Sequence, residues 1–384
     1  MNRANGLDTL RAVAIVLVFM YHYMVFVSHE ATFGWASEIG WAGVDLFFVL
    51  SGYLIGDQIF RGLGRGQRLS VKVFYARRFL RTLPNYYVVL AFYFLLPALM
   101  GGKAPPPLWR FLTFTQNLGL KPGTAFSHAW SLCIEEQFYL LLPLVALAAT
   151  RVRGSLRLAW IFLAGLTLAA ITLRSVLWFQ YGREDFGSIS SYYPNVYYSS
   201  LCRFDEFLPG VAIALLRNFH RAAWERLTQW GNGILAAGTL AVAGIAFLAL
   251  RYYYVDGYGY GFFMSGFGYS LLSVCFAILV LAALSPASLL YRIRVPGAAR
   301  LAAWSYAIYL SHKPLAFITQ NLLHGSAGAG ALLAIVSCVC VAGGWLLYRL
   351  VETPFMKFRS RRFPTNFPAA PAAQSAQALI QPAR

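Results

Sequence analysis

The sequence predicts an all-α fold, a polytopic membrane helix bundle of about ten transmembrane helices with both termini in the cytoplasm. Of its 384 residues, 59% are hydrophobic and 12% are charged, whereas soluble domains contain about 45–50% apolar and about 25% charged residues. The mean hydropathy is +0.57, and 16% of the residues are aromatic, as expected where Tyr and Trp line membrane interfaces. Two further observations support this fold class: the sequence contains long apolar runs, and its basic residues are unevenly distributed between those runs.

Ten apolar runs are predicted to cross the ~30 Å hydrocarbon core of a membrane. They cover about residues 10–27, 41–60, 84–101, 131–149, 158–177, 203–217, 232–250, 263–284, 301–320 and 331–350. Of the 32 Lys and Arg residues, 24 fall on the side of the two termini, five on the other side and three at or inside the runs. The positive-inside rule places the side with 24 in the cytoplasm. The net charge of +18 is therefore a topology signal, and no nucleic acid is expected as a partner, because the charges form no stripe on one soluble module.

The first run, in LDTLRAVAIVLVFMYHYMVF, contains Arg11 and His22. Eleven residues turn a helix by ~1,100°, so the two side chains share a face and lie ~16 Å apart along the axis. A histidine this deep in a membrane can exchange a proton, and it is tolerated only toward the bundle interior or a wet cavity. A functional role for His22 is preferred; the alternative is a structural histidine bonded to a neighbouring helix. The run is interpreted as a retained helix, because no small-residue cleavage site follows it.

The second run, GWAGVDLFFVLSGYLIG, places Asp45 inside the membrane. A buried carboxylate there needs a partner, and the candidates are His22, Arg11 and Arg203. Small residues in this run let a helix or a ligand approach closely, and helix packing alone explains Gly52.

The segment VKVFYARRFLRTLP, before the third run, carries Arg77, Arg78 and Arg81. Arg78 and Arg81 are three residues apart and share a helix face. Clustered guanidinium groups suit phosphate recognition through paired hydrogen bonds. The alternative, a cytoplasmic anchor that contacts anionic membrane lipids, stays open.

The fourth run, in HAWSLCIEEQFYLLLPL, begins with the adjacent residues Glu135 and Glu136. Adjacent side chains point ~100° apart, so one glutamate at most faces a given cavity, and Tyr139 shares the face of Glu135. A carboxylate here would hold a histidine tautomer or help a hydroxyl lose its proton. A helix-capping role fits one of the two glutamates but not both.

The remaining candidate chemistry is sparse. The five cysteines are predicted to be small buried hydrophobes: Cys133, Cys202, Cys275, Cys338 and Cys340. The six histidines lack the spacings of metal ligands, so no metal is expected.

In order and spacing, these motifs resemble the acyltransferase-3 family of integral-membrane acyltransferases. The likeness rests on RAVAIVLVFMYH, GVDLFFVLSGYLI, RFLR, WSLCIEEQFYLLLP, SYAIYLSHKPL and VETP. It runs from about residue 5 to about residue 356, and the membrane acyltransferase domain is accordingly predicted at 1–356.

The resemblance implies transfer of an acyl group, commonly acetyl from acetyl-CoA, in the bacterial inner (plasma) membrane. The implied acceptor is a hydroxyl of an envelope polysaccharide or glycolipid, or of a small natural product. The resemblance makes His22 the base toward the acceptor, with support from Arg11, Asp45, Glu135 and Glu136. It assigns Arg77, Arg78 and Arg81 to the acyl-CoA donor.

The last part of the chain raises two further expectations. His312, beside Lys313, is interpreted as structural or interfacial, with a second functional histidine as the alternative. Residues 357–384 are basic and rich in Pro and Ala, and they are predicted to be a disordered cytoplasmic tail. Some family members carry a fused extracytoplasmic domain; here a separate extracytoplasmic partner enzyme, or a single-step transfer, is expected.

A transporter or lipid-linked-sugar flippase is the rival function. About ten helices and buried charges fit it too. However, the charged motifs concentrate in the first four runs and are not repeated in the second half of the sequence. Many carriers, in contrast, consist of two related halves. Donor-dependent ester formation would separate the two classes of protein.

Overall fold

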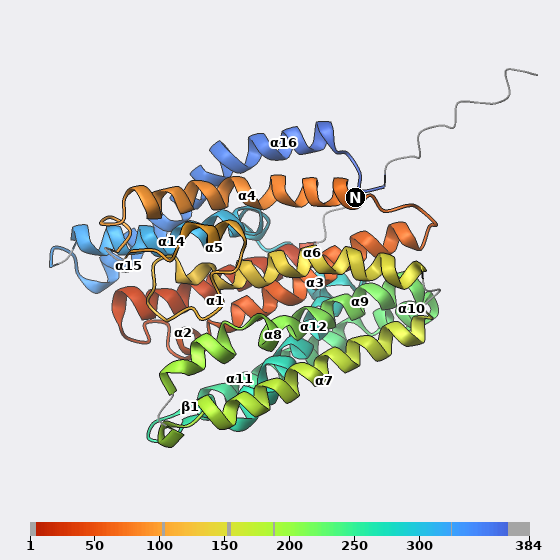
Figure 1. Ribbon diagram of the computed structural model, residues 1–384, viewed down its shortest axis with the longest axis horizontal. Helices are drawn as coiled ribbons and strands as arrows, with labels where there is room; N and C mark the ends of the chain where they lie inside the picture. The colour runs from red at the N-terminus through yellow and green to blue at the C-terminus, as the bar shows by residue number, and fades with distance from the viewer. Residues whose placement is uncertain (1–4, 102–103, 152–154, 187–188, 324, 368–384) are drawn as a thin grey trace, which may run out of the picture.

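The computed structural model is a bundle of long helices (Figure 1) and describes residues 5–101, 104–151, 155–186, 189–323 and 325–367. The first half contains α1 (Asn5–Tyr23), η1 (Met24–Ser28), α2 (Trp35–Glu38), α3 (Ala42–Leu63), α4 (Val71–Leu95), α5 (Leu108–Leu112), η2 (Ser127–Ala129), α6 (Trp130–Arg151) and α7 (Leu156–Tyr181). The middle contains η3 (Glu184–Phe186), η4 (Ile189–Ser191), η5 (Tyr193–Tyr197), α8 (Ser200–Arg203), η6 (Phe204–Phe207), α9 (Leu208–Phe219), α10 (Arg221–Gln229) and α11 (Gly231–Tyr252). The rest contains η7 (Met264–Gly268), α12 (Tyr269–Leu284), α13 (Leu289–Arg292), α14 (Ala298–Leu323), α15 (Ala329–Leu347), η8 (Tyr348–Glu352) and α16 (Thr353–Arg362).

Strands are a minor feature. Within the described ranges the two named strands are β1 (Tyr254–Val255) and β2 (Gly259–Tyr260). They pair antiparallel, with Tyr254 opposite Tyr260, and form a small hairpin between α11 and η7. The all-α prediction is confirmed in this sense.

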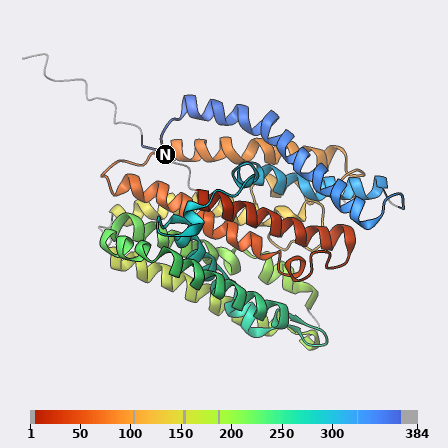
Figure 2. The same cartoon turned by 180° about the vertical axis from the view of Figure 1, so that it is seen from behind.

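The centre of the bundle is formed by α1 and α3. Helix α1 packs against α3, α12 and α14, and α3 packs against α9 as well. In Figures 1 and 2, α4 and α16 lie along one edge of the bundle and α7 and α11 along the opposite edge. In the most apolar stretch of α3, 83% of the residues are buried, whereas in that of α7 only 6% are buried. Therefore α3 is enclosed by protein, whereas α7 presents its apolar side chains outward, as lipid-facing helices do.

Glycines allow α3 and α9 to cross closely. A Cβ atom at Gly52 would lie 2.1 Å from the carbonyl oxygen of Phe207, and one at Gly210 would lie 2.1 Å from that of Val49. Any larger residue at either position would force the two backbones apart. The packing role predicted for Gly52 is confirmed.

Seven helical segments are long and apolar enough to cross a membrane among the residues that the structure describes. They are Asn5–Ser28, Ala42–Leu63, Ser127–Thr150, Leu156–Tyr181, Gly231–Tyr252, Met264–Leu284 and Ala329–Arg362. The other three predicted runs coincide with α4, α9 and α14, which are helical but fall outside this set. Helix α9 has 12 residues, a rise of ~18 Å against a core of ~30 Å.

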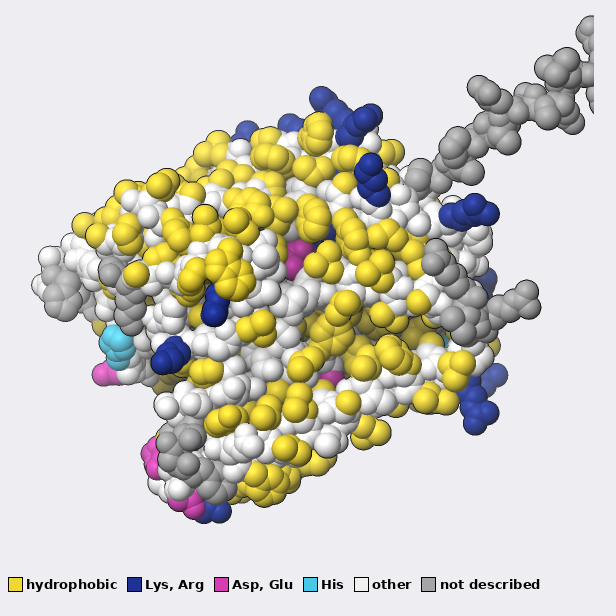
Figure 3. Space-filling model, viewed as in Figure 1, with side chains coloured by type: hydrophobic (Ala, Val, Ile, Leu, Met, Phe, Trp, Pro, Cys, Tyr) yellow, Lys and Arg dark blue, Asp and Glu magenta, His cyan; other side chains and the backbone are white. Residues whose placement is uncertain are grey.

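Most of the charged side chains visible in Figure 3 lie away from the middle of the bundle, where small acidic and basic patches also show. Figure 3 shows a broad hydrophobic band, with dark-blue Lys and Arg side chains along α16 and at the end where the N-terminus lies. The acidic side chains visible at the surface lie mainly at the opposite end. A multi-pass membrane protein has this division between an apolar belt and polar ends.

Three details differ from the sequence-based expectations. The third run was predicted to begin at Pro84, but helix α4 begins at Val71, after the cap of Ser70, and continues through Pro84. Membrane helices tolerate Pro when neighbouring groups bond the freed carbonyls. The tail predicted from residue 357 starts inside α16, which continues to Arg362, and residues 368–384 lie outside the described part. Cys338 is exposed rather than buried, and Cys275 is half-buried.

Candidate active site

A polar cavity opens between α1, α3, α4, α6 and α14. We call it the arginine cavity, because Arg11, Arg78 and Arg81 line it. Its other polar wall residues are Ser51, Thr82, Ser131, Glu135, Tyr139, Ser305, Tyr306 and Tyr309. The sequence-based prediction that Arg78 and Arg81 share one helix face holds, since both reach this cavity.

The arginine cavity contains more positive than negative charge. Glu135 is its one acidic wall residue and accepts hydrogen bonds from Ser51 and Tyr139. The Arg78 guanidinium lies 3.7 Å from the centre of the Tyr139 ring. The Nε atoms of Arg11 and Arg78 are buried and lack a hydrogen-bond partner within the described residues. Buried donors of this kind favour an anionic ligand, because each unpaired group is costly without one.

A second cavity lies around the far end of α1. We call it the histidine cavity, because the rings of His22 and His128 line it. The rest of its wall is mainly aromatic: Tyr21, Phe26, Trp41, Trp130, Tyr193, Tyr197, Tyr198 and Tyr309. Apolar and aromatic walls with a few converging polar groups are typical of sites that bind small ligands.

The hydrogen bonds of His312 fix how His22 is protonated when both rings are neutral. His312 Nδ1 lies 3.0 Å from the carbonyl oxygen of Ile308; since a carbonyl only accepts, Nδ1 carries the proton and Nε2 is an acceptor. His22 Nδ1 lies 2.7 Å from that Nε2, so His22 donates from Nδ1. Nε2 of His22 is then the unprotonated nitrogen, on a ring that lines the cavity. A ring in this tautomer is ready to act as a base.

His128 is held in the same cavity by α14. Its Nε2 lies 3.2 Å from the carbonyl oxygen of Leu310, and Tyr309 donates a 2.6 Å hydrogen bond to its backbone carbonyl. Nδ1 of His128 is therefore an acceptor; it is buried and has no partner among the described residues. Phe126, two residues earlier, has a φ of 55°, a strained conformation that is typical of functional segments.

The two cavities meet. Val44 and Tyr309 belong to the walls of both. Tyr309 gives its single hydroxyl proton to the His128 carbonyl, so Ser131, 2.6 Å away, donates to it. A donor in the arginine cavity and an acceptor in the histidine cavity would face each other across these two side chains.

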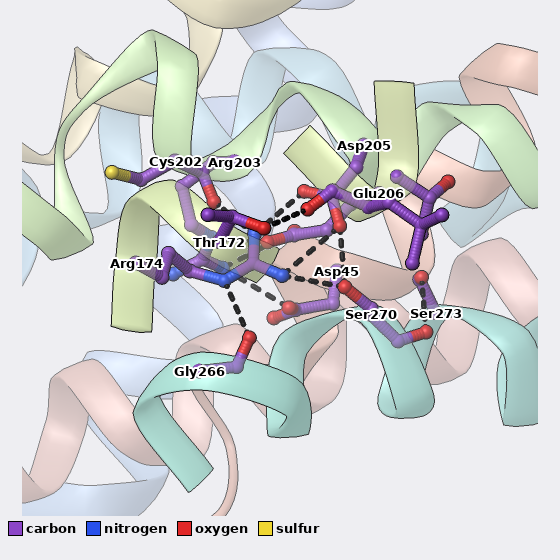
Figure 4. A network of polar contacts seen from close by, with 12 residues as sticks. Asp45, Thr172, Arg174, Cys202, Arg203, Asp205, Glu206, Gly266, Ser270 and Ser273 are labelled. Atoms are coloured by element: carbon purple, nitrogen blue, oxygen red, sulfur yellow. Dashed lines mark hydrogen bonds and ion pairs between the residues drawn. The ribbon is translucent and has the colours of Figure 1, made fainter. Parts of the chain in front are cut away.

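Asp45 lies outside both cavities, in a buried ion-pair network (Figure 4). Of its three candidate partners, the structure selects Arg203, whose Nη2 donates to Asp45 Oδ1 at 3.0 Å. Arg203 also pairs with Glu206, and its guanidinium lies 4.0 Å from the centre of the Tyr269 ring. This arrangement ties α3 to α8, η6 and α12.

A second pair completes the network. Arg174 binds both carboxylate oxygens of Asp205, at 2.7 and 3.1 Å, and donates to the Gly266 carbonyl at 3.0 Å. Arg174 and Arg203 are both 0% exposed. Asp45 Oδ2 and Arg203 Nη1 are buried without a hydrogen-bond partner among the described residues, but neither side chain lines the arginine cavity or the histidine cavity. Because its ion pairs connect four helical segments, we regard this network as structural.

The other predicted site residues divide in two. Glu135 faces the arginine cavity, whereas Glu136 is buried beside it and is not one of its wall residues. Arg77 turns away and donates to the carbonyl of Phe363. Arg81 pairs with Glu352 at 3.1 Å, a contact between α4 and η8.

Sequence reasoning missed His128 and Tyr309. His128 opens the quoted motif HAWSLCIEEQFYLLLPL, and Tyr309 stands three residues before His312, on the same helix face. Both signals were present in the sequence. What a sequence lacks is the packing of α14 against η2 and α1, which brings these residues to His22. The described residues contain no group of three or more His, Cys, Asp or Glu side chains placed to hold a metal ion.

Comparison with protein families matches the chain to the acyltransferase domain (Acyl_transf_3) over residues 4–349. Among individual proteins, the chain is 28% identical over 373 residues to the peptidoglycan O-acetyltransferase OatA of Listeria monocytogenes. It is 31% identical over 379 residues to YrhL of Bacillus subtilis, named provisionally for the same activity, and 25% identical over 378 residues to the O-acetyltransferase OatA of Staphylococcus aureus.

These relatives are longer than the chain. The alignments cover 92–93% of this chain but only 56–57% of each relative. The chain thus spans little more than half of their length. No solved structure matches it.

Proposed function

Because the chain belongs to the acyltransferase family whose domain covers residues 4–349, we propose that it is a membrane-bound O-acetyltransferase. It moves an acetyl group from acyl-CoA to a hydroxyl of an envelope polysaccharide or glycolipid. One observation carries the proposal: a cation-rich cavity and a histidine-bearing aromatic cavity meet at Val44 and Tyr309.

The arginine cavity is the donor site. Acyl-CoA carries phosphates that match clustered guanidinium groups, and Arg11, Arg78 and Arg81 supply them. The unpartnered Nε atoms of Arg11 and Arg78 support an anionic ligand. Glu135, held by Ser51 and Tyr139, is the one carboxylate in the wall of this cavity.

The histidine cavity is the acceptor site, and His22 is the base. Nε2 of His22 takes the proton of the acceptor hydroxyl while the hydroxyl oxygen attacks the thioester carbonyl carbon and the carbon–sulfur bond breaks. CoA leaves as the thiolate and takes the proton from His22, which returns the base to its neutral form. His312 holds the His22 ring in the tautomer that this step needs. A base positioned in this way contributes about 10²–10⁴-fold to a rate.

The aromatic wall favours a sugar-like acceptor. Ring faces such as those of Trp130 and Tyr197 provide broad apolar contact area, and the neighbouring hydroxyl and imidazole groups provide hydrogen bonds. Two of the relatives are named for peptidoglycan O-acetylation, which supports an envelope glycan as the final acceptor. A separate extracytoplasmic enzyme as the acyl recipient belongs to the same proposal.

We place the protein in the plasma membrane with about ten spans and both termini in the cytoplasm. The 24 basic residues counted on one side support this orientation. Arg11 lies on that side of His22 along α1, so the donor enters from the cytoplasm and the acceptor from the opposite face.

The experiment uses membranes containing the wild type or His22→Ala and acetyl-labelled acetyl-CoA. Alkali-labile label in the lipid, glycan or small-molecule fraction that depends on His22 is the expected result, and the labelled fraction identifies the acceptor class. If the wild type neither binds the donor nor forms an ester, the transporter interpretation replaces this one.

A further inference from the structure

We propose that a groove between α4 and the C-terminal helix α16 binds the 3′-phosphorylated nucleotide end of the acyl-CoA donor. This inference rests on the proposed function and adds a second donor subsite to it. The groove lies on the edge of the bundle where α4 and α16 run together (Figure 1).

The groove continues from the arginine cavity through one residue. Arg81 lines both the cavity and the groove. Beyond it the groove is lined by Tyr348, Glu352, Lys357, Ser360 and Arg361, among others. A ligand whose thioester lies in the cavity can therefore extend past Arg81 into the groove and reach α16.

The charges of the groove favour an anion. Its one acidic wall residue, Glu352, is already engaged by Arg81 at 3.1 Å and by Asn85 at 2.9 Å. Lys357 and Arg361 are exposed and form no ion pair with any described residue. Two cations, with Ser360 between them on the helix, are left to bind a ligand.

A neighbouring arginine adds to the excess charge. Arg359, on α16, is repelled by Arg77, Arg78 and Arg81 of α4 and is attracted by Glu352. Its Nε is buried and lacks a hydrogen-bond partner within the described part of the chain. Like charges held this close destabilise the contact between the two helices unless an anion lies between or beside them. A bound polyphosphate would relieve that repulsion.

The shape of acyl-CoA fits this division of the surface. The flexible arm and its thioester are narrow and uncharged, whereas the nucleotide end carries two bridging phosphates and a 3′-phosphate on the ribose. We assign the bridging phosphates to the region of Arg78 and Arg81, and the 3′-phosphate to Lys357 and Arg361. Tyr348 offers a ring face to the adenine, since every base stacks on aromatic side chains.

A phosphate of a membrane lipid has the same chemistry, so the test must separate the two sources. The full chain is reconstituted in nanodiscs of a zwitterionic lipid and in nanodiscs that contain an anionic lipid. Binding of acetyl-CoA and of 3′-dephospho-acetyl-CoA is measured by equilibrium dialysis, which needs no acceptor. The variants are Lys357→Ala with Arg361→Ala, and the control Arg362→Ala, an exposed arginine of the same helix that does not line the groove.

In zwitterionic nanodiscs we expect the wild type to bind acetyl-CoA about tenfold more tightly than the dephospho compound, because a charge-assisted contact is lost. The double variant loses that preference by weakening acetyl-CoA alone, and Arg362→Ala keeps it. If the wild type binds both donors equally, the proposed 3′-phosphate subsite is wrong, but the assignment of the arginine cavity to the acyl-CoA donor is unaffected. Loss of binding by the double variant in anionic nanodiscs only would identify a lipid site instead. Failure of the wild type to bind either donor overturns the proposed function itself.

Discussion

Nδ1 of His22 lies 2.7 Å from Nε2 of His312, and the two rings stack with centroids 4.9 Å apart. Helix α14 thus orients the candidate base of α1 across 290 residues of sequence. If His312 only fills space, replacing it leaves catalysis intact. If it sets the tautomer of His22, as the hydrogen bonds indicate, it acts on turnover and not on donor binding.

We therefore expect His312→Ala to lower kcat about 10–100-fold with little change in the donor KM, as loss of a partner that orients a functional imidazole does. His312→Gln should restore part of kcat, because its side-chain oxygen can accept from His22 Nδ1. The measurement is steady-state acetyl transfer with purified protein. Equal activity of the alanine and glutamine variants would show that no acceptor is needed at this position.

His22→Ala should abolish turnover, a loss of at least about 10²-fold, because general-base catalysis contributes 10²–10⁴-fold. Donor binding should stay at the wild-type level, since His22 does not line the arginine cavity. Equilibrium binding of acetyl-CoA to the variant is thus both the control for folding and the test of the two-cavity arrangement. Wild-type turnover by His22→Ala would remove it from the mechanism.

Arg78→Ala combined with Arg81→Ala should raise the donor KM about tenfold or more, because charge-assisted contacts to phosphate are lost. Arg77→Ala is the control: it removes one arginine of the same helix, whose guanidinium bonds the Phe363 carbonyl outside the cavity. An unchanged donor KM in the double variant would favour the lipid-anchor alternative.

The features that depend on helix spacing could be predicted from the sequence. Arg78 and Arg81 share a wall, Glu135 contacts Tyr139 four residues later, and α1 turns both Arg11 and His22 toward cavities. Each follows from 3.6 residues per turn, as the all-α fold follows from apolar runs.

Contacts between distant helices could not be predicted in the same way. Three partners were open for Asp45, and the choice of Arg203 depends on how α3 packs against η6, which directly follows the helix α8 that carries Arg203. Likewise, the role of His312 depends on the packing of α14 against α1. Spacing within one helix carries no information on which helix lies beside it, and this is why His128 and Tyr309 were missed.

Asp45→Asn should destabilise the fold rather than stop the chemistry. Removing one member of a buried ion pair leaves the other charge uncompensated and costs about 3–5 kcal/mol. Arg203 would keep Glu206 as a partner, so we expect the lower end of that range. The measurement is thermal unfolding in detergent together with the kcat of the folded fraction. A fully stable Asp45→Asn protein with no activity would instead support the catalytic role that the family resemblance implied.

His128 offers the sharpest test of the acceptor site, because the residue is 3% exposed and its Nδ1 is an acceptor with no protein partner among the described residues. We expect this nitrogen to accept a hydrogen bond from the acceptor substrate. His128→Leu should raise the acceptor KM about tenfold, since an unmade buried hydrogen bond costs about 1–3 kcal/mol. His128→Asn should raise the acceptor KM less, because the asparagine oxygen can occupy the position of Nδ1.

Donor binding should not change in either variant, as His128 does not line the arginine cavity. Acceptor titrations at saturating acetyl-CoA measure both. Equal losses in the two variants would mean that the imidazole serves only to hold η2 against α14 through the Leu310 carbonyl.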